Sequence, residues 1–215
     1  MSFDVLARIV EVISGVDFNT FVAERIVKPL KLMDTAFWVE GAERQARIAE
    51  PQIDPATGKK TPYASDMTKR PKWISGGGGL VSTAQDYARL CLMFLNGGTL
   101  DGVRLVSRKT IEHMTSNNVP PGYKSAYPVQ TQIGWPTPSL ETGQGFGLGF
   151  GINCEPGLSP LPGSKGDYYW PGILGTYFWV DPKEQLIAIL MIQAPTQLFP
   201  YQYLMRQYVY QAIWD

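Results

Sequence analysis

The segment from Asp167 to Ala194, DYYWPGILGTYFWVDPKEQLIAILMIQA, decides the fold of this sequence. It contains two runs of aliphatic and aromatic residues, Ile173–Val180 and Gln185–Gln193, which favour β-strands. Residues 181–184 (DPKE) lie between them and supply the proline and the charges typical of a tight turn. We therefore predict a β-hairpin. Trp170-Pro171-Gly172 precedes its first strand, where glycine allows close approach of another group and proline removes a ladder donor, so this end of the strand is suited to a ligand.

Composition limits the classes of protein to which the chain can belong. The 215 residues are 44% hydrophobic, and 19 basic and 19 acidic residues give a formal net charge of zero. A sizeable core is expected, whereas nucleic acid and anionic membranes are not expected partners of a neutral chain. One histidine and two cysteines without ligand spacing predict no metal and no cofactor. We also expect no membrane span, because every apolar run is short, and no signal peptide.

Helical periodicity and capping residues predict five helices around this hairpin. The helix that starts at Ser82 has a capping box, because Gln85 follows three residues later. The first helix is expected to be short and mostly buried, since apolar residues dominate it. The five expected helices cover residues 2–14, 19–27, 82–96, 107–115 and 200–214, and a strand is expected over residues 146–154.

Two features admit both a functional and a structural interpretation. Four glycines at 76–79 precede a helix, as in phosphate-binding loops, but no Gly-Lys-Ser/Thr ending or GxGxxG spacing follows. Close backbone packing is therefore the better account of the glycines. His113 lies on a short helix without a nucleophile near it in sequence, and we expect it on the surface or in packing rather than as a catalytic base.

Residues 117–145 predict a long loop, because they are rich in Pro, Gly, Ser and Thr and have no sustained periodicity. Tyr123, Tyr127 and Trp135 make it a candidate lining of a substrate cleft. A surface excursion that covers the core is an equal alternative.

Four blocks of this sequence resemble the C-terminal part of the serine β-lactamase and penicillin-binding-protein superfamily. They are FDVLARIVEVISG with VKPLKLMDTAFWV, then GGGGLVSTAQDYARLCLMFLNGGTLDGVRLVSRKTIEHMTSN, then FGLGFGI and finally WPGILGTYFWVDP, and in order and spacing they cover nearly the whole chain. The class C β-lactamase and family VIII carboxylesterase branch is the most similar. The resemblance implies an α+β fold, with an antiparallel sheet flanked by helices, in one domain over residues 1–215.

Members of this superfamily use a Ser-x-x-Lys motif, a Tyr-x-Asn or Tyr-x-Ser motif and a Lys-Thr-Gly-like triplet. No serine of this chain has lysine three residues later, and Gly-x-Ser-x-Gly is absent as well. Tyr63-Ala64-Ser65 and Tyr123-Lys124-Ser125 match as strings but lie in the wrong blocks, so we treat them as chance. Because the family carries its first two motifs ahead of the FDVLARIVEVISG block, we expect an N-terminally truncated domain.

The third motif is represented by Trp170-Pro171-Gly172, which is similar to the triplet of the esterase branch. Tryptophan in place of lysine removes the charge that would hold a substrate carboxylate, so uncharged esters are the expected substrates. The resemblance implies that the backbone N–H of Ile173 is an oxyanion donor and that Trp170, Pro171 and Gly172 contact the substrate. An ordinary aromatic strand start remains the structural alternative.

The resemblance thus implies a carboxylesterase that hydrolyses small esters, or lactams, through an acyl-serine intermediate. Because the chain lacks the nucleophile and base, we expect no acyl transfer by the chain alone. The rival hypothesis is a non-catalytic binding or self-associating module of the same fold. An uncovered sheet edge would recruit either a second copy or a complementing N-terminal segment.

Overall fold

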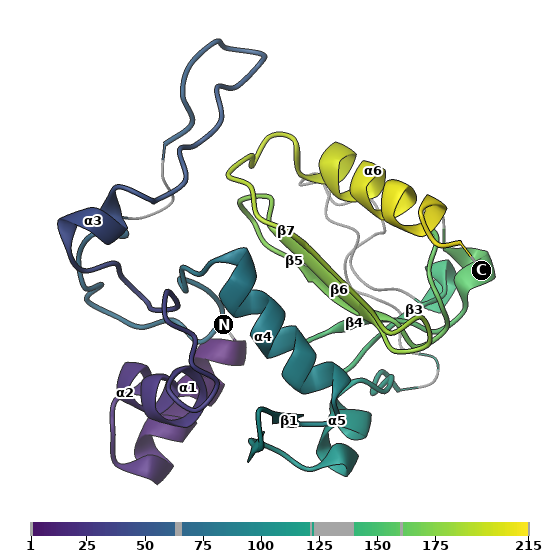
Figure 1. The fold of residues 1–215 in the computed structure, drawn as a ribbon, viewed down its shortest axis with the longest axis horizontal. Coiled ribbons are helices and arrows are strands. Elements are labelled where there is room, and N and C mark those ends of the chain that lie inside the picture. The colour runs from purple at the N-terminus through teal and green to yellow at the C-terminus, as the bar shows by residue number, and fades with distance from the viewer. Residues whose placement is uncertain (1, 63–65, 121, 123–139, 160, 215) are drawn as a thin grey trace. The chain divides into compact units, whose positions relative to one another are not determined.

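The computed structural model describes residues 2–62, 66–120, 122, 140–159 and 161–214. The chain divides into two compact units, the first made of residues 1–93 and 99–105 and the second of residues 94–98 and 106–215. Helices and antiparallel strands together confirm the α+β class that the sequence predicts (Figure 1). Among the described residues, no helix has the length and apolar character that a membrane span requires.

The first unit is mainly helical. Its first helix was expected to be mostly buried, and this expectation is wrong: of its residues only Ala7 is buried, while Val12 is 68% and Ile13 81% exposed. The Asp17 side chain accepts the Thr20 N–H and begins the second helix, as a capping residue should. The elements are α1 (Ser2–Ser14), α2 (Phe18–Val22), the π-helical turn η1 (Ala23–Val27), α3 (Ala42–Gln45), α4 (Ala84–Leu95), β1 (Thr99–Leu100) and β2 (Val103–Arg104).

The predicted helix at 82–96 forms as α4, but a different residue caps it. The Asp86 N–H donates to Thr83 Oγ1 at 3.3 Å, so Thr83 is the capping side chain. Ser82 instead shares a 2.8 Å hydroxyl contact with Thr35. The buried Asp86 carboxylate accepts the Asp34 N–H at 2.6 Å and the Thr35 hydroxyl at 2.9 Å, which joins α4 to the segment after η1.

The second unit is built on a five-stranded sheet, antiparallel throughout, in the order β3-β4-β5-β6-β7. Every strand therefore pairs with its neighbour in sequence, a meander that needs only short connections. The strands are β3 (Gln144–Phe146), β4 (Gly151–Asn153), β5 (Tyr168–Pro171), β6 (Tyr177–Asp181) and β7 (Leu186–Leu190); the helices are α5 (Arg108–Met114), η2 (Leu140–Thr142), η3 (Pro156–Leu158) and α6 (Leu198–Gln211).

The predicted hairpin is confirmed, with Tyr177 opposite Leu190 and Asp181 opposite Leu186. The bounds differ from the prediction, since the second strand ends at Leu190 rather than Gln193. The first strand begins at Tyr177 rather than Ile173, because Gly172 and Gly175 close a turn there. The single strand expected at 146–154 is itself a hairpin, β3–β4, in which the Gly147 N–H donates to the Phe150 carbonyl at 2.8 Å.

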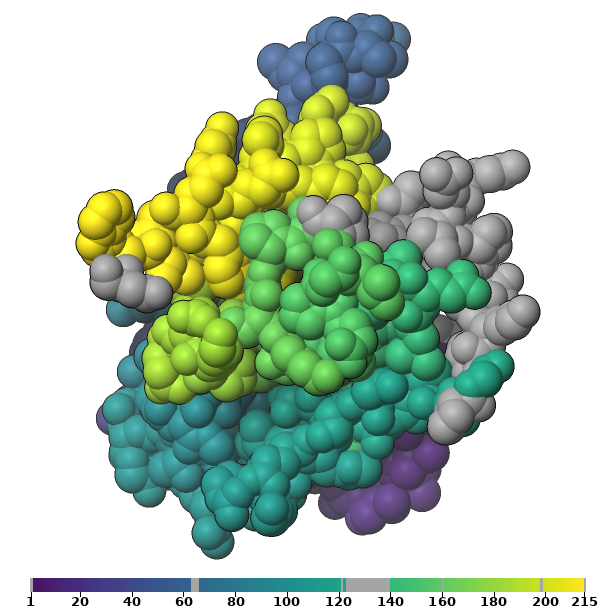
Figure 2. Space-filling model, turned by 90° about the vertical axis from the view of Figure 1, so that its right-hand side faces the viewer, coloured from purple at the N-terminus to yellow at the C-terminus, as the bar shows by residue number. Residues whose placement is uncertain are grey.

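Both faces of the sheet in the second unit carry aromatic side chains. α6 lies across one face (Figure 1), where a core of Tyr169, Tyr177, Trp179 and Ala188 receives Met205 and Val209 of the helix. The other face carries Phe150, whose ring lies 5.3 Å from Tyr168 and 6.2 Å from Phe178. In the space-filling view, the yellow atoms of α6 adjoin the green atoms of residues near 150–170 (Figure 2).

Candidate functional site

A turn from Gly172 to Gly175 joins β5 to β6 and contains the predicted oxyanion donor. The Gly175 N–H donates to the Gly172 carbonyl at 3.0 Å, and the Gly172 N–H donates to the Thr176 carbonyl at 2.7 Å. Gly175 has a φ of 107°, which side chains rarely allow. A Cβ on Gly172 would overlap the Thr176 hydroxyl. The backbone of this turn is therefore held in one conformation that requires both glycines.

Ile173 occupies the second position of this turn. Its side chain is 66% exposed, and among the described residues its backbone N–H has no hydrogen-bond partner. An N–H that is free in a fixed turn is able to donate to a substrate oxygen without reorganisation. The geometry is compatible with the oxyanion role predicted for Ile173, which stays a prediction.

Trp170 and Phe146 form an aromatic wall beside the turn. Trp170 is half-buried near the end of β5, and its ring meets that of Phe146 edge to face, with centroids 5.3 Å apart and an interplanar angle of 70°. Such a pair is stabilised beyond its buried area. Pro171 is buried opposite Tyr177 of β6. The structure thus brings together Trp170, Pro171 and Gly172. The Trp170 ring is partly exposed, whereas Pro171 is buried.

A hollow of about 300 Å³ adjoins the aromatic wall through Phe146. Its lining among the described residues consists of Asn118, Val119, Pro120, Phe146 and Gly147. Tyr123, Tyr127 and Trp135, the predicted cleft residues, lie outside the residues that the structure describes. The wall carries no charge, because the sequence from Tyr168 to Val180 has no charged side chain.

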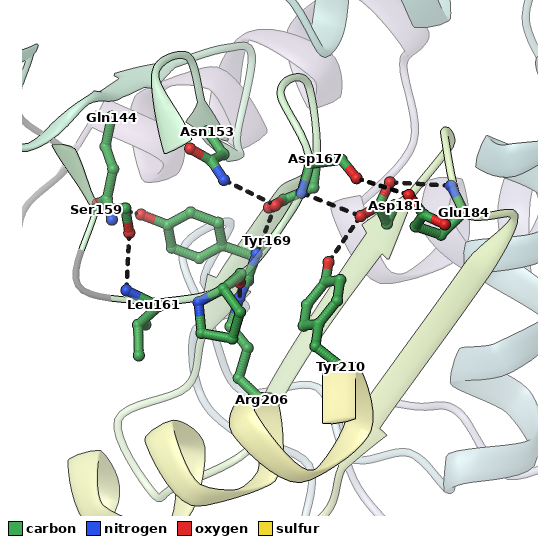
Figure 3. Close-up of polar contacts among 12 residues, drawn as sticks. Gln144, Asn153, Ser159, Leu161, Asp167, Tyr169, Asp181, Glu184, Arg206 and Tyr210 are labelled. Atoms are coloured by element: carbon green, nitrogen blue, oxygen red, sulfur yellow. Dashed lines mark hydrogen bonds and ion pairs between the residues drawn. The ribbon is translucent and has the colours of Figure 1, made fainter. Parts of the chain in front are cut away.

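A buried polar network supports the start of β5 (Figure 3). We call Asp167, Asn153, Arg206 and Tyr177 the Asp167 network. Asp167 accepts hydrogen bonds from Arg206 at 2.5 Å and from Asn153 at 3.0 Å, and Arg206 also donates to the Tyr177 hydroxyl at 3.0 Å. The Asp167 network thereby ties α6 to β4, β5 and β6. Its role here is to hold the strand that ends at Trp170 and Pro171.

Burial dominates the electrostatics of the Asp167 network. It raises the pKa of the Asp167 carboxyl above the ordinary value, while the Arg206 charge and the bonds from Arg206 and Asn153 lower it. Burial likewise raises the pKa of Tyr177, so its phenol stays neutral. The network is enclosed, although Asp167 Oδ1 and Asn153 Oδ1 are buried without a hydrogen-bond partner among the described residues. Because its charged groups pair with each other inside the unit, we interpret it as support for β5 rather than as a reaction centre.

The other candidate sites remain structural. His113 is exposed at the end of α5, in agreement with the surface position expected for it. Gly76 packs so closely on α1 that an added Cβ would lie 2.7 Å from the Ala7 Cβ, so close packing accounts for this glycine, whereas Gly78 has open space around it and Gly79 has a φ of 92°. The Asp4 carboxylate accepts the Ser75 hydroxyl at 2.7 Å and completes this contact. Within the described part of the chain, no three acidic, histidine or cysteine side chains are grouped to hold a metal ion.

The comparison with protein families decides the identification. A family model described as Beta-lactamase matches residues 1–208. The chain belongs to the beta-lactamase family. This confirms the resemblance found in the four sequence blocks, and with it the family's α+β fold.

A curated relative and two solved structures are similar to this chain over most of its length. Protein Rv1367c of Mycobacterium tuberculosis is 32% identical over 196 residues, which cover 89% of this chain and 47% of that protein. Simvastatin synthase (LovD) from Aspergillus terreus has a TM-score of 0.78 and 21% identity, over 97% of this chain and 54% of that chain. EstCE1, a hydrolase with promiscuous acyltransferase activity, has a TM-score of 0.74 and 19% identity over the same shares. This chain spans about half the length of the relatives it matches.

Sequence reasoning did not identify Phe146 or Arg206 as supports of the site. Phe146 contacts Trp170 from a strand 24 positions earlier, and nothing in the local pattern predicts that pairing. Arg206 did carry a signal: it is the sole charged residue of α6. A single charge in a helix of aromatic and aliphatic residues indicates a buried partner.

Proposed function

We propose that this chain supplies the oxyanion and substrate wall of a beta-lactamase-family serine hydrolase that acts on small uncharged esters. The observation that carries the proposal is the turn that follows Trp170 and Pro171, because the Ile173 N–H in it has no hydrogen-bond partner among the described residues, and the Trp170 ring that precedes it packs on Phe146. Membership of the family supports the serine-hydrolase chemistry. The acyltransferase activity of EstCE1 supports ester substrates over lactams.

In the proposed reaction a serine Oγ adds to the ester carbonyl and passes its proton to a neighbouring base. The carbonyl oxygen becomes an oxyanion, to which the Ile173 N–H donates. The C–O bond to the leaving alcohol then breaks as the alcohol takes up a proton. Water adds to the acyl-serine, and the carboxylic acid and the free serine are released.

The chain alone is proposed to be inactive in this reaction. Its sequence contains no Ser-x-x-Lys and no Gly-x-Ser-x-Gly, and a substrate wall cannot replace a missing nucleophile. The measurement is a stopped-flow assay of the pure chain with p-nitrophenyl acetate. We expect no burst of p-nitrophenol. A burst that disappears on treatment with a serine-directed phosphonate would overturn the inactive assignment.

Substrate preference follows from the uncharged wall. A penicillin presents a carboxylate, whereas residues 168–180 offer no cation to pair with it. We expect ethyl acetate to shift the amide resonance of Ile173 and the indole N–H resonance of Trp170 in an NMR titration, and benzylpenicillin to shift them less at equal concentration. Stronger binding of the penicillin would contradict the ester assignment.

The variant Ile173→Pro isolates the backbone donor. Proline is favoured at the second position of common turns, and the N–H that it removes has no partner among the described residues. We therefore expect an unchanged melting temperature and loss of the ester-induced shift at Trp170. The matched control is Ile173→Ala, which keeps the N–H and should keep the shift. Equal shifts in both variants would remove the N–H from the proposal.

The second candidate function is a non-catalytic module that keeps this wall without the chemistry. It makes a different prediction from the first. A binding module retains ligand affinity in the chain alone and gains no activity with any added polypeptide. If the chain instead supplies one wall of a serine hydrolase, ester hydrolysis should appear when a polypeptide that carries the serine and lysine is added.

A further inference from the structure

Two turns of the second unit lie at the same end of its sheet. β4 begins at Gly151, opposite Tyr169 of β5, and β5 ends two residues after Tyr169. Because β4 and β5 are antiparallel, the residues before Gly151 and the residues after β5 leave the sheet at the same end. The β3–β4 turn and the β5–β6 turn, which contains the Ile173 N–H, therefore belong to one end of two adjacent strands.

The hollow of about 300 Å³ is built at the β3–β4 turn. Phe146 and Gly147, where β3 runs into this turn, line it together with residues 118–120. The Phe146 ring also meets the Trp170 ring, at a centroid distance of 5.3 Å. One aromatic ring thus belongs both to the hollow and to the wall that precedes Ile173. A group bound in the hollow would contact this shared ring.

The described lining of the hollow is apolar and uncharged. Val119, Pro120 and the Phe146 ring are apolar, and Gly147 contributes backbone only. Asn118 is the polar member, and its side-chain amide donates to two backbone carbonyls at 3.1 and 2.9 Å, which occupies both of its N–H groups. A lining of this kind favours an apolar group over a carboxylate or an ammonium group, which would lose its hydration there.

Hydrogen bonds fix this lining in advance. The Asn117 side-chain oxygen accepts the N–H of Val119 at 3.0 Å and that of Phe146 at 3.2 Å, and the Asn118 N–H donates to the Phe146 carbonyl at 2.8 Å. These bonds also close the β3 edge of the sheet. Gly147 packs so closely that an added Cβ would overlap the backbone carbonyl at the end of α5. A pocket that is already formed binds without the cost of ordering its walls.

We propose that this hollow binds an apolar chain of several methylene groups, carried by the ester whose carbonyl oxygen accepts the Ile173 N–H. The inference rests on the proposed function and narrows its substrate class. It assigns Val119 and Phe146 as residues that determine specificity. Pockets for small molecules measure about 300–1,000 Å³, so a hollow of about 300 Å³ suits one chain of this kind. An acetate ester of a short alcohol would leave the hollow unfilled.

An NMR titration with three esters separates the chain from the ester group. Methyl acetate has the ester without a long chain, whereas methyl heptanoate and hexyl acetate are isomers that carry a hexyl chain on the acyl and on the alcohol side. We expect at least one isomer to shift the amide resonances of Val119 and Gly147, which methyl acetate leaves in place. That isomer should bind at least about tenfold more tightly than methyl acetate, since each buried CH₂ adds about fourfold. The tighter isomer identifies the side of the ester that carries the chain.

A pair of matched substitutions tests the hollow itself. Val119→Trp fills it, and Val12→Trp makes the same change on α1, at a position that is 68% exposed. We expect Val119→Trp to weaken binding of the tighter isomer at least about fivefold and to leave the shift of Ile173 by methyl acetate unchanged. Val12→Trp should alter neither. Intermolecular NOEs between the hexyl chain and the Val119 methyl groups of the unmodified chain test the same contact if Val119→Trp folds poorly.

The outcomes distinguish the hollow from the oxyanion donor. If methyl acetate shifts Ile173 but neither isomer reaches Val119 or binds more tightly, the hollow is overturned and the proposed function stands. If the hexyl chain contacts Val119 while no ester shifts Ile173, the hollow is supported and the proposed ester function is overturned. Equal weakening by Val119→Trp and Val12→Trp would also overturn the assignment of the hollow.

Discussion

The substitution Arg206→Met tests whether the Asp167 network holds α6 and β5 together. The Arg206 guanidinium lies 2.5 Å from the Asp167 carboxylate, and the two side chains are 3% and 0% exposed. Arg206 also donates to the Pro162 carbonyl at 2.7 Å and to the Tyr177 hydroxyl at 3.0 Å. Methionine has similar length but no charge and no donor. The change therefore leaves a buried carboxylate without its cation.

The expected cost is large because a buried ion loses its partner. Removing one member of a buried ion pair lowers the free energy of unfolding by about 3–5 kcal/mol. The matched control is Lys165→Met, which breaks the 2.7 Å pair with Glu155, whose side chains are 68% and 60% exposed. An exposed pair contributes about 0–1 kcal/mol. Urea unfolding followed by tryptophan fluorescence gives both values on the same chain.

The pH dependence of the Arg206→Met effect has a definite sign. Burial raises the pKa of Asp167 and Arg206 lowers it, so the variant has a higher Asp167 pKa than the unmodified chain. A carboxyl whose pKa is raised by folding stabilises the protein below its unfolded pKa, and this stability is lost as pH rises through the folded pKa. The cost of Arg206→Met should thus be full at neutral pH and shrink as pH falls toward 3.8, the ordinary pKa of an aspartate side chain.

The double variant Asp167→Asn/Arg206→Met completes the cycle. Removing both charges should cost less than the sum of the two single changes, because neither ion is left buried alone. The reasoning is refuted if Arg206→Met costs no more than Lys165→Met. It is also refuted if the cost grows as pH falls, since a protonated Asp167 needs no cation.

The remaining predictions concern single contacts. Gly172→Ala should destabilise the chain by about 1–3 kcal/mol through overlap with Thr176, and Thr176→Ala in the same chain should restore the melting temperature; no rescue would contradict the overlap. Asn117→Ala should lower the free energy of unfolding by about 1 kcal/mol and speed amide exchange of Phe146, whereas unchanged exchange would show that the edge is closed otherwise. Burial raises the pKa of Cys91 to about 12, so in a Cys154→Ala chain, which removes the partly exposed second thiol, Ellman's reagent at pH 8 should react only after unfolding, and prompt reaction of that folded chain would disprove the burial.

The β6–β7 hairpin was predictable because its signal is local. Apolar runs on both sides of Asp181 and Pro182 define two strands and one turn, and the structure needs no distant residue to form them. The cap at Ser107 was predictable for the same reason, whereas the cap at Asp17 was not predicted. Ser82 was assigned as a cap incorrectly, because Thr83 beside it offers the same hydroxyl one residue closer to the helix. Tertiary contact with Thr35 decides between them.

The environment of the candidate site depends on contacts that are distant in sequence. Trp170 was recognised from its triplet, but its partner Phe146 lies on another strand. The α1 residues were expected in a core because they are apolar, yet Ile9 is 45% exposed. Apolar character predicts burial only where another surface is present to cover it. Whether such a surface is present depends on the whole protein, so burial cannot be predicted from the sequence of one helix.

The candidate site combines a strand, β5, that is held at both ends with a partly exposed aromatic ring, Trp170. β5 is held at its start by the buried pair of Asp167 and Arg206, and at its end by the turn whose two glycines fix Ile173. Between these ends lies Trp170, partly exposed and without a charged neighbour in the strand. A fixed N–H beside an apolar ring has little to contribute to the stability of the sheet. Its rigidity is instead what an oxyanion donor requires, since preorganised donors stabilise a transition state without reorganising. We propose that the buried Asp167 pair, by holding β5 at its start, helps to fix the position from which Ile173 would donate.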